Sequence, residues 1–306
     1  MLPAMKILYA TDGSDASRSA AVLLAALVNR SDVELTVLCV AEVELMFAEA
    51  YFAEGDLLGE VRRRSKKLVD ATTSELRDVG FAAQGQVIEG RPGPTIVRSA
   101  KTGGYDLVVV GAGSKSWMGN LLLGSVSTHV LHASPCAVLV VHEPPAQVEH
   151  LKVLVATDGS GSAEGAAATL TSIADPSRCE VTVMSVAEVP YLLVAGYPFT
   201  PLAGVSPEIV TDLLERARSN SERLVHSLQS AGIAAESVVT DGSPRSLILD
   251  RAQTGRYDLV VLGTQGHGPI LSGVLGSVSD AVSRHARATL VGRVPDEQVE
   301  NEEDRR

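Results

Sequence analysis

The sequence is poor in residues that mark several common protein classes. It has three cysteines and one tryptophan among 306 residues, and aromatic residues make up only 4%. The cysteines, Cys39, Cys136 and Cys179, show no metal-type spacing, and two of them lie in or beside apolar runs. We therefore expect buried free thiols, with neither a disulfide framework nor a cysteine metal site.

Long apolar runs and a surplus of positive charge are also missing. The longest uncharged apolar stretch near the start, Ala20 to Val28, is far shorter than the roughly 18 residues of a membrane-spanning helix. The first residues lack the order of a secretory signal, so we expect a cytoplasmic protein without a membrane partner. Lys and Arg number 26 against 37 Asp and Glu, and the resulting net charge of -11 removes the electrostatic basis for binding nucleic acid.

The chain contains an internal repeat. The matching segments are 6–14 with 152–160, 105–111 with 257–263, and 124–127 with 276–279. Each copy is long enough to be a domain with its own core. The predicted organisation is a first domain at 1–143, a Pro-containing linker at 144–150, a second domain at 151–294 and a charge-rich, disordered tail at 295–306.

Within each copy, short β-branched runs alternate with longer segments of helical period. This alternation is typical of an α/β fold in which helices connect parallel strands. The strands expected in the first copy are Lys6–Ala10, Glu34–Val40, Ala83–Ile88, Leu107–Gly111 and Ala137–His142. Amphipathic helices are expected over 57–79 and 210–228, each followed by a glycine, and a longer loop over Pro190 to Pro207.

Two polar loops follow the first and fourth strands, where open parallel sheets bind ligands. The first loop reads Thr-Asp-Gly-Ser in both copies, at 11–14 and 157–160. Capping of the next helix by Asp or Ser explains this sequence, and so does an Asp that binds a ribose hydroxyl or a metal. The residues alone leave both explanations open.

The second loop of copy two is rich in glycine and ends in Gly276-Ser277 at a predicted helix start. Free N–H groups and the positive dipole end at such a position attract an anion. The chain has no Gly-Lys pair, which excludes a Walker A loop, and the glycines do not complete a Gly-x-Gly-x-x-Gly fingerprint.

The glycine spacing in copy two is more specific. Gly263, Gly266, Gly276 and Ser277 fit the pattern Gly-x2-Gly-x9-Gly-Ser/Thr, and on this pattern the chain resembles a tandem universal stress protein of the ATP-binding type. The resemblance implies two doubly wound five-stranded parallel sheets, each with strand order 3-2-1-4-5, and binding of ATP, or of ADP or AMP, with Mg²⁺. The nucleotide positions it implies in copy two are Thr157, Asp158, Val186, Gly263, Thr264, Gln265, Gly266, His267, Gly276, Ser277, Val278 and Ser279, with Asp158 also near the metal.

Copy one departs from the pattern because Ser114 replaces the second glycine. Its Cβ could obstruct a phosphate, or its hydroxyl and the ammonium of Lys115 could bind one, so the sequence leaves binding in copy one open and favours copy two. The matching positions in copy one are Thr11, Asp12, Val40, Gly111, Gly113, Ser114, Lys115, Gly124, Ser125, Val126 and Ser127, with Asp12 near the metal.

The predicted function is that of a nucleotide-dependent regulator of the stress response, for which no reaction is required. The alternatives are a slow Mg²⁺-dependent ATP hydrolase and a structural interaction protein that binds no nucleotide. The resemblance also implies an internal pseudo-dimer joined through the last strand of each copy. A homodimer of chains and an unidentified protein partner are further expectations.

Overall fold

The computed structural model describes residues 4–42, 57–113, 123–188, 191–194, 197–201, 207–264 and 275–293. The first half contains β1 (Met5–Ala10), α1 (Asp15–Leu27), the 3-10 turn η1 (Arg30–Asp32), β2 (Val33–Ala41), α3 (Leu57–Asp78), β3 (Ala83–Glu89), α4 (Pro92–Gly103), β4 (Leu107–Gly111), α5 (Ser125–Ala133) and β5 (Ala137–Val141). The second half contains β6 (Leu151–Thr157), α6 (Gly161–Ile173), β7 (Cys179–Ala187), β8 (Tyr191–Val194), β9 (Tyr197–Pro201), α7 (Pro207–Ser230), β10 (Ala234–Asp241), α8 (Pro244–Thr254), β11 (Leu259–Gly263), α9 (Ser277–His285) and β12 (Ala288–Gly292).

The predicted elements are confirmed. All five strands expected in the first half form, with boundaries that differ by about one residue, and the two predicted amphipathic helices are α3 and α7. The expected long loop between Pro190 and Pro207 differs, because it contains the two-stranded antiparallel sheet of β8 and β9. Residues 191–194 read Tyr-Leu-Leu-Val, and the aromatic Tyr191 and β-branched Val194 favour a short strand once a partner strand lies beside it.

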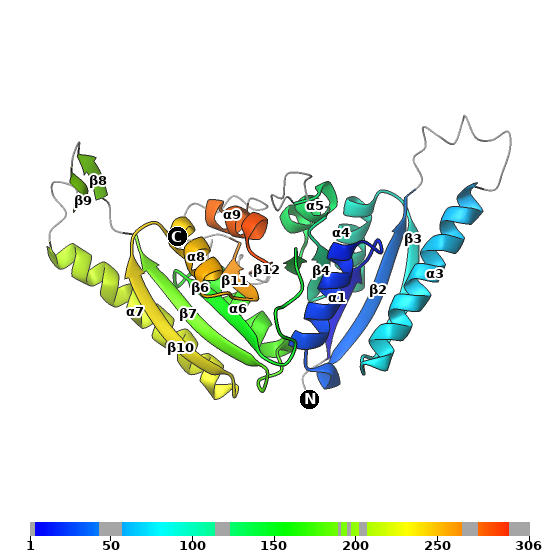
Figure 1. Cartoon of the computed structure of the whole chain (residues 1–306), viewed down its shortest axis with the longest axis horizontal. Helices are drawn as coiled ribbons and strands as arrows, with labels where there is room; N and C mark the ends of the chain where they lie inside the picture. The colour runs from blue at the N-terminus through cyan, green and yellow to red at the C-terminus, as the bar shows by residue number, and fades with distance from the viewer. Residues whose placement is uncertain are drawn as a thin grey trace, which may run out of the picture.

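The α/β class and the doubly wound arrangement are also confirmed, with one difference. The ten main strands form a single sheet of order β10-β7-β6-β11-β12-β5-β4-β1-β2-β3, whereas two separate sheets were expected. Each half keeps the order 3-2-1-4-5 when the β8–β9 hairpin is left aside. The halves join through β5 and β12, which pair antiparallel from Val138 with Val291 to Val141 with Ala288 (Figure 1). These are the last strands of the two halves, through which the resemblance implies pairing.

Helices cover both faces of this sheet. Residues of α1, α3, α6 and α7 belong to one core cluster, while α4 and α5, and α8 and α9, contribute to separate clusters in each half. Strands β4, β5, β11 and β12 are buried on both faces apart from the half-buried Gly111, as expected for strands that helices cover on two sides (Figure 1).

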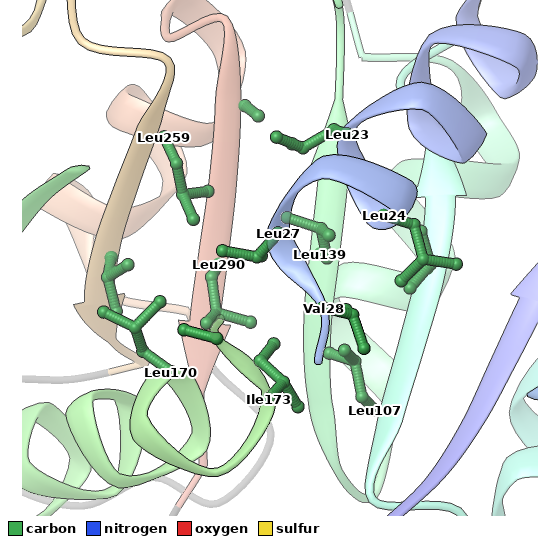
Figure 2. Close-up of a cluster of buried hydrophobic side chains, with 14 of the residues drawn as sticks. Leu23, Leu24, Leu27, Val28, Leu107, Leu139, Leu170, Ile173, Leu259 and Leu290 are labelled. Carbon is green, nitrogen blue, oxygen red and sulfur yellow. The ribbon is translucent and has the colours of Figure 1, made fainter. Parts of the chain in front are cut away.

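The largest core cluster crosses the seam between the halves. Leu27 and Leu139 of the first half and Ile173 and Leu290 of the second half belong to it, and all four are fully buried. Figure 2 shows these side chains facing one another in the space between the two halves, from α1, α6, β5 and β12. Burial of each such side chain contributes about 1.5–3 kcal/mol, so the two halves stabilise one another through a common core.

Backbone hydrogen bonds also cross the seam. The N–H of Asn29 donates to the carbonyl of Ile173 at 2.7 Å, and the N–H of Asp175 donates to the carbonyl of Leu27 at 2.8 Å. The carboxyl ends of α1 and α6 are therefore held together.

The segment between the halves is held by a buried carboxylate. Asp258 is only 4% exposed and accepts hydrogen bonds from the N–H of Ala146 at 2.8 Å and of Lys152 at 3.1 Å. The connection therefore follows a fixed path along the second half.

Neither a membrane-spanning helix nor a disulfide was expected from the composition. No helix in the described part of the chain is long and apolar enough to cross a membrane. The three cysteines are free thiols, and Cys39 and Cys179 are buried as predicted, whereas Cys136 is only half-buried.

The seam contains a buried histidine whose protonation should affect stability. Burial lowers the pKa of His142, although the carbonyl of Ser283, 2.8 Å from its Nε2, and the neighbouring Glu143 act in the opposite direction. The folded protein thus binds this proton less readily than the unfolded chain. The stabilisation is present above the ordinary histidine pKa near 6.5 and is lost as the pH falls through the lower folded value.

We expect the free energy of unfolding to fall more steeply for wild type than for His142→Gln between about pH 7.5 and about pH 5.5, because glutamine keeps a donor but does not titrate. Urea unfolding at the two pH values measures this difference. The exposed His150→Gln substitution is the control and should follow wild type. Equal slopes for wild type and His142→Gln would contradict the prediction.

Candidate functional site

The carboxyl ends of β1, β2 and β4 meet at one edge of the first half, with β1 between the other two. The loops that leave β1 and β4, together with the start of α5, surround a cavity of about 280 Å³ there. Its lining residues are Ala10, Thr11, Asp12, Ser14, Ser17, Leu38, Val40, Glu42, Pro92, Ile96, Val110, Gly111, Gly113, Gly124, Ser125, Val126 and Ser127. The structure therefore brings together every described residue predicted for the copy-one site. Ser114 and Lys115 lie outside the described residues.

The Thr-Asp-Gly-Ser loop turns from β1 into α1 in a defined way. Ser14 is the N-cap residue, and its hydroxyl accepts from the N–H of Ser17 at 3.2 Å. Oδ1 of Asp12 accepts from the N–H of Ser14 at 2.9 Å, and Gly13 allows the turn with a φ of +76°. Capping by serine is thus confirmed, while the Asp12 carboxylate lines the cavity.

The surroundings of Asp12 favour the ionised form of its carboxyl group. Burial raises its pKa, but hydrogen bonds from the side chain and backbone of Ser14 and from the side chain of Ser17 outweigh burial, and the net pKa lies below the ordinary value. Because these bonds stabilise the charged form, Asp12 is a carboxylate at neutral pH and can accept from a hydroxyl or bind a cation.

The N-terminus of α5 forms another wall of the cavity. Its N-cap is Gly124, which offers no side chain, and the helical ladder begins with the N–H of Thr128 bonded to the carbonyl of Gly124 at 2.9 Å. The first-turn N–H groups before Thr128 have no acceptor in the helix itself. Together with the positive end of the helix dipole, they favour an anion at this wall.

The hydroxyls of Ser127 and Ser279 are used inside the protein. Each is buried and donates to the carbonyl at the end of the preceding strand, Ser127 to Gly111 and Ser279 to Gly263, at 2.7 Å in both cases. These bonds attach the starts of α5 and α9 to β4 and β11. At both serines the donor left for an anion is therefore the backbone N–H, because the hydroxyl proton is already used inside the protein.

Gly111 and Gly263 must be glycine for a packing reason that the sequence alone does not reveal. A Cβ at Gly111 would lie 2.5 Å from the backbone C of Ala16 and N of Ser17, and one at Gly263 would lie 2.7 Å from the N of Ala163. Neither residue has room for a side chain because α1 and α6 cross directly over the strand ends. The glycines thus permit helix-to-strand contact at the site.

The remaining wall of the cavity is apolar. Leu38, Val40 and Ile96 line it, from β2 and α4. Glu42, Pro92 and Ile96 also line the cavity and are not among the positions predicted from the sequence, although Glu42 directly follows β2 and Pro92 begins the helix after β3. The rule that ligand sites collect at the carboxyl ends of strands could have found both positions.

The second half repeats the described parts of this arrangement. Ser160 caps α6, Oδ1 of Asp158 accepts from the N–H of Ser160 at 2.9 Å, and Gly159 has a φ of +82°. The N-cap of α9 is Gly276, whose N–H donates to the carbonyl of Thr264 at 2.8 Å. Thr157, Asp158, Val186, Gly263, Thr264 and 276–279 lie at the ends of β6, β7 and β11 or at the start of α9. Gln265, Gly266 and His267 lie outside the described residues.

The charged side chains that line the cavity, among the described residues, are acidic. Asp12 and Glu42 line it, and no Lys or Arg does so among the described residues. The nearby guanidinium of Arg18 donates to the carbonyl of Gly13 on the exposed side of the loop. No group of three or more His, Cys, Asp or Glu side chains is placed to hold a metal in the part of the chain that the structure describes. A cation at Asp12 would thus need oxygen ligands from a bound molecule or water.

The fold and the cavity define a class: a tandem, doubly wound α/β protein with a ligand-sized cavity beside the switch point of its strand order. Comparison with known families agrees with this class. The model of the universal stress protein family matches residues 4–142 and 150–291. The chain therefore belongs to the universal stress protein family, a family of the stress response, and carries two of its domains in tandem.

Individual relatives support this membership. The chain is 30% identical to the universal stress protein Rv2005c of Mycobacterium tuberculosis over 217 residues, which is 70% of each chain. It is 29% identical to the universal stress protein YxiE of Bacillus subtilis over 145 residues, 44% of this chain and 97% of that protein.

Solved structures share the fold over the whole chain. The crystal structure of a universal stress protein from Archaeoglobus fulgidus superposes with a TM-score of 0.68 at 21% identity, covering 94% of this chain and 98% of that one. A universal stress protein structure from Pseudomonas aeruginosa covers 98% of this chain and 97% of its own, with a TM-score of 0.64 at 17% identity.

The close contact at Gly111 gives a test of the site's construction. We expect Gly111→Ala to lower the free energy of unfolding by about 1–3 kcal/mol, because its Cβ would overlap the backbone of α1. Gly104→Ala is the matched control. Gly104 has a φ of +61° but open space around it, so only the backbone strain of about 1 kcal/mol is expected. Urea unfolding measures both, and equal costs would show that the overlap is absent.

Proposed function

We propose that this universal stress protein is a cytoplasmic regulator that binds an adenine nucleotide, with one site beside Asp12 and an equivalent site beside Asp158. The observation that carries the proposal is the cavity of the first half, which brings an apolar wall, a carboxylate and an uncapped helix N-terminus together. Its volume of about 280 Å³ is close to the lower end of small-molecule sites.

The three walls match the three parts of a nucleotide. Leu38, Val40 and Ile96 provide a surface against which a flat base can pack. The carboxylate of Asp12 can accept from a ribose hydroxyl or bind Mg²⁺. The N–H groups at the start of α5 suit phosphate oxygens. A ligand that combines an apolar ring, hydroxyls and an anion fits better than a ligand with only one of these.

The residues present also fit Mg²⁺ bound together with the nucleotide. The described lining holds the ionised Asp12 and no positive side chain, so a triphosphate would need a cation to reduce repulsion. Magnesium is commonly held by one or two carboxylates plus phosphate oxygens and water. Asp12, and Asp158 in the second half, would hold it, and the ion would supply charge neutralisation.

Regulation is favoured over hydrolysis by the same lining. Transfer of a phosphoryl group needs positive groups around the γ-phosphate and a residue that orients water. Neither a Lys nor an Arg lines the cavity among the described residues. A nucleotide bound there would change the stability and partners of the protein by its occupancy alone.

Calorimetric titration of ATP with Mg²⁺ into nucleotide-free protein tests the proposal. We expect two sites per chain, and Asp12→Asn and Asp158→Asn should each weaken one site by about tenfold or more. Asparagine keeps the acceptor for the following N–H but loses the charge. The exposed Asp70→Asn, whose native partner is Lys66 on α3, is the control and should leave both sites unchanged.

The outcome separates the alternatives. Two sites, each weakened most by the substitution of its own aspartate, would support the proposal for both halves. Loss of all binding in Asp158→Asn would restrict the site to the second half. Absence of heat with ATP, ADP and AMP, together with no nucleotide carried through purification, would contradict the proposal and favour a structural interaction protein.

A regulator of this kind should turn over ATP only slowly. We expect phosphate release from ATP to remain well below the roughly 1 s⁻¹ at the low end of ordinary enzymes, because the described site offers no cation for the transition state. A continuous phosphate assay with wild type measures it, and Asp12→Asn/Asp158→Asn gives the background. Turnover of several per second that the double substitution abolishes would favour the hydrolase.

A further inference from the structure

A side chain that follows the last strand of the second half holds a helix of the first half. Arg293 comes directly after β12, and its Nη2 donates to the carbonyls of Leu131 at 2.7 Å and His132 at 3.2 Å. Both carbonyls lie in the last turn of α5, where no further helical N–H is available to them. A guanidinium of the second half therefore satisfies the carboxyl end of α5.

The same arrangement occurs in the opposite direction. His142 comes directly after β5, and its Nε2 lies 2.8 Å from the carbonyl of Ser283 in the last turn of α9. Arg293 and His142 follow equivalent strands of the repeat. Two different side chains thus each contact carbonyls in the last turn of the other half's final helix. The contact therefore follows from the antiparallel pairing of β5 with β12.

Arg293 is placed to hold α5 firmly. Burial lowers the pKa of its guanidinium, which nevertheless stays charged, as arginine does in proteins. Its Nε is buried without a hydrogen-bond partner, so the two bonds of Nη2 to α5 carry the polar interaction. A cation at the carboxyl end of α5 also complements an anion at its N-terminus, where the candidate site lies.

The backbone of Arg293 is tied to the second site through α6. A Cβ at Gly165 would lie 3.0 Å from the carbonyl oxygen of Arg293, and a Cβ at Gly292 would lie 2.3 Å from the Cα of Ala166. The end of β12 therefore packs directly against α6, backbone to backbone. Ser160 is the N-cap residue of α6, and its N–H donates to Oδ1 of Asp158 in the second site.

The start of α9 provides a second link between the halves. Leu275 precedes the N-cap Gly276 and is 8% exposed. It packs in a core cluster that consists of first-half residues apart from Leu275 itself and Val291. The start of α9, where the proposed nucleotide would place its phosphate, is thus supported by the first half.

We propose that Arg293 is a positioning residue that couples the two nucleotide sites. A nucleotide beside Asp158 fixes α6 and the end of β12, and Arg293 then holds α5 where its N-terminus binds the phosphate of a nucleotide beside Asp12. The coupling is positive because the first ligand orders the contacts that the second one needs, and it is reciprocal by linkage. This inference rests on the proposed nucleotide-binding function.

Titration of nucleotide-free full-length chain with ATP and Mg²⁺ tests the coupling. The affinity of the Asp12 site is compared between wild type and Asp158→Asn, at nucleotide concentrations that leave the altered site empty. We expect the affinity to be about fivefold or more lower in Asp158→Asn, the usual lower range of allosteric coupling. In Arg293→Met, which keeps an apolar stem but loses the donors, adding Asp158→Asn should make no further difference.

Arg77→Met is the matched control. Nε of Arg77 donates to the carbonyl of Ala83 at 2.8 Å, which connects α3 to β3 inside the first half and away from both sites. The fivefold difference should persist in this variant. Where Arg293→Met does not fold, as judged by circular dichroism, Arg293→Lys takes its place, and its single ammonium should reduce the difference.

Hydrogen exchange supplies a readout that does not depend on affinity. In Asp12→Asn, an ATP concentration is chosen that fills the second site and leaves the weakened Asp12 site empty. Occupancy of the second site should then slow amide exchange in α5 across the seam. The effect should disappear in Asp12→Asn/Arg293→Met.

Each other result counts against the coupling. Equal affinities in wild type and Asp158→Asn would overturn it while leaving the nucleotide function intact. An equal loss from Arg293→Met in both backgrounds, with the difference retained, would show that Arg293 is merely structural. Absence of ATP binding by wild type would overturn the proposed function and the coupling together.

Discussion

The antiparallel pairing of β5 with β12 determines where everything else in this protein lies. It places two fully buried strands in the middle of a ten-stranded sheet and creates one core below them, in which Leu27, Leu139, Ile173 and Leu290 meet. Because that core is common to both halves, neither half buries its apolar surface alone. The helices that begin at the candidate sites all pack against this seam or end beside it.

The candidate sites follow from the topology of each half. A strand order that reverses beside β1 leaves the carboxyl ends of β1 and β4 adjacent, with two helices starting there. One helix, α1, is closed by the hydroxyl of Ser14, whereas α5 begins at a glycine without a capping side chain. The difference between a capped and an uncapped helix explains why an anion is expected at one wall of the cavity and a carboxylate at another.

Much of this arrangement could be predicted from the sequence, because local patterns carry it. The strands and the two long helices follow from periodicity and repetition. The strand order within each half and the cavity residues that were predicted are what the family resemblance implies, and the glycine pattern carries that resemblance. The reason for Gly111 could not be predicted, since the backbone of α1 that excludes a side chain is distant in sequence. The bond of Ser127 to Gly111, the continuous sheet and the contact of Arg293 with α5 depend on tertiary packing as well.

The fixed connection between the halves, held by Asp258 at Ala146 and Lys152, has a consequence for symmetry. Two separate subunits of one sequence must carry the same residue at both ends of a twofold contact, and dilution separates them. Within one chain the halves meet at a high effective concentration that dilution does not change. The two ends can then differ, as arginine and histidine do here, and one end can respond to protons while the other keeps its charge.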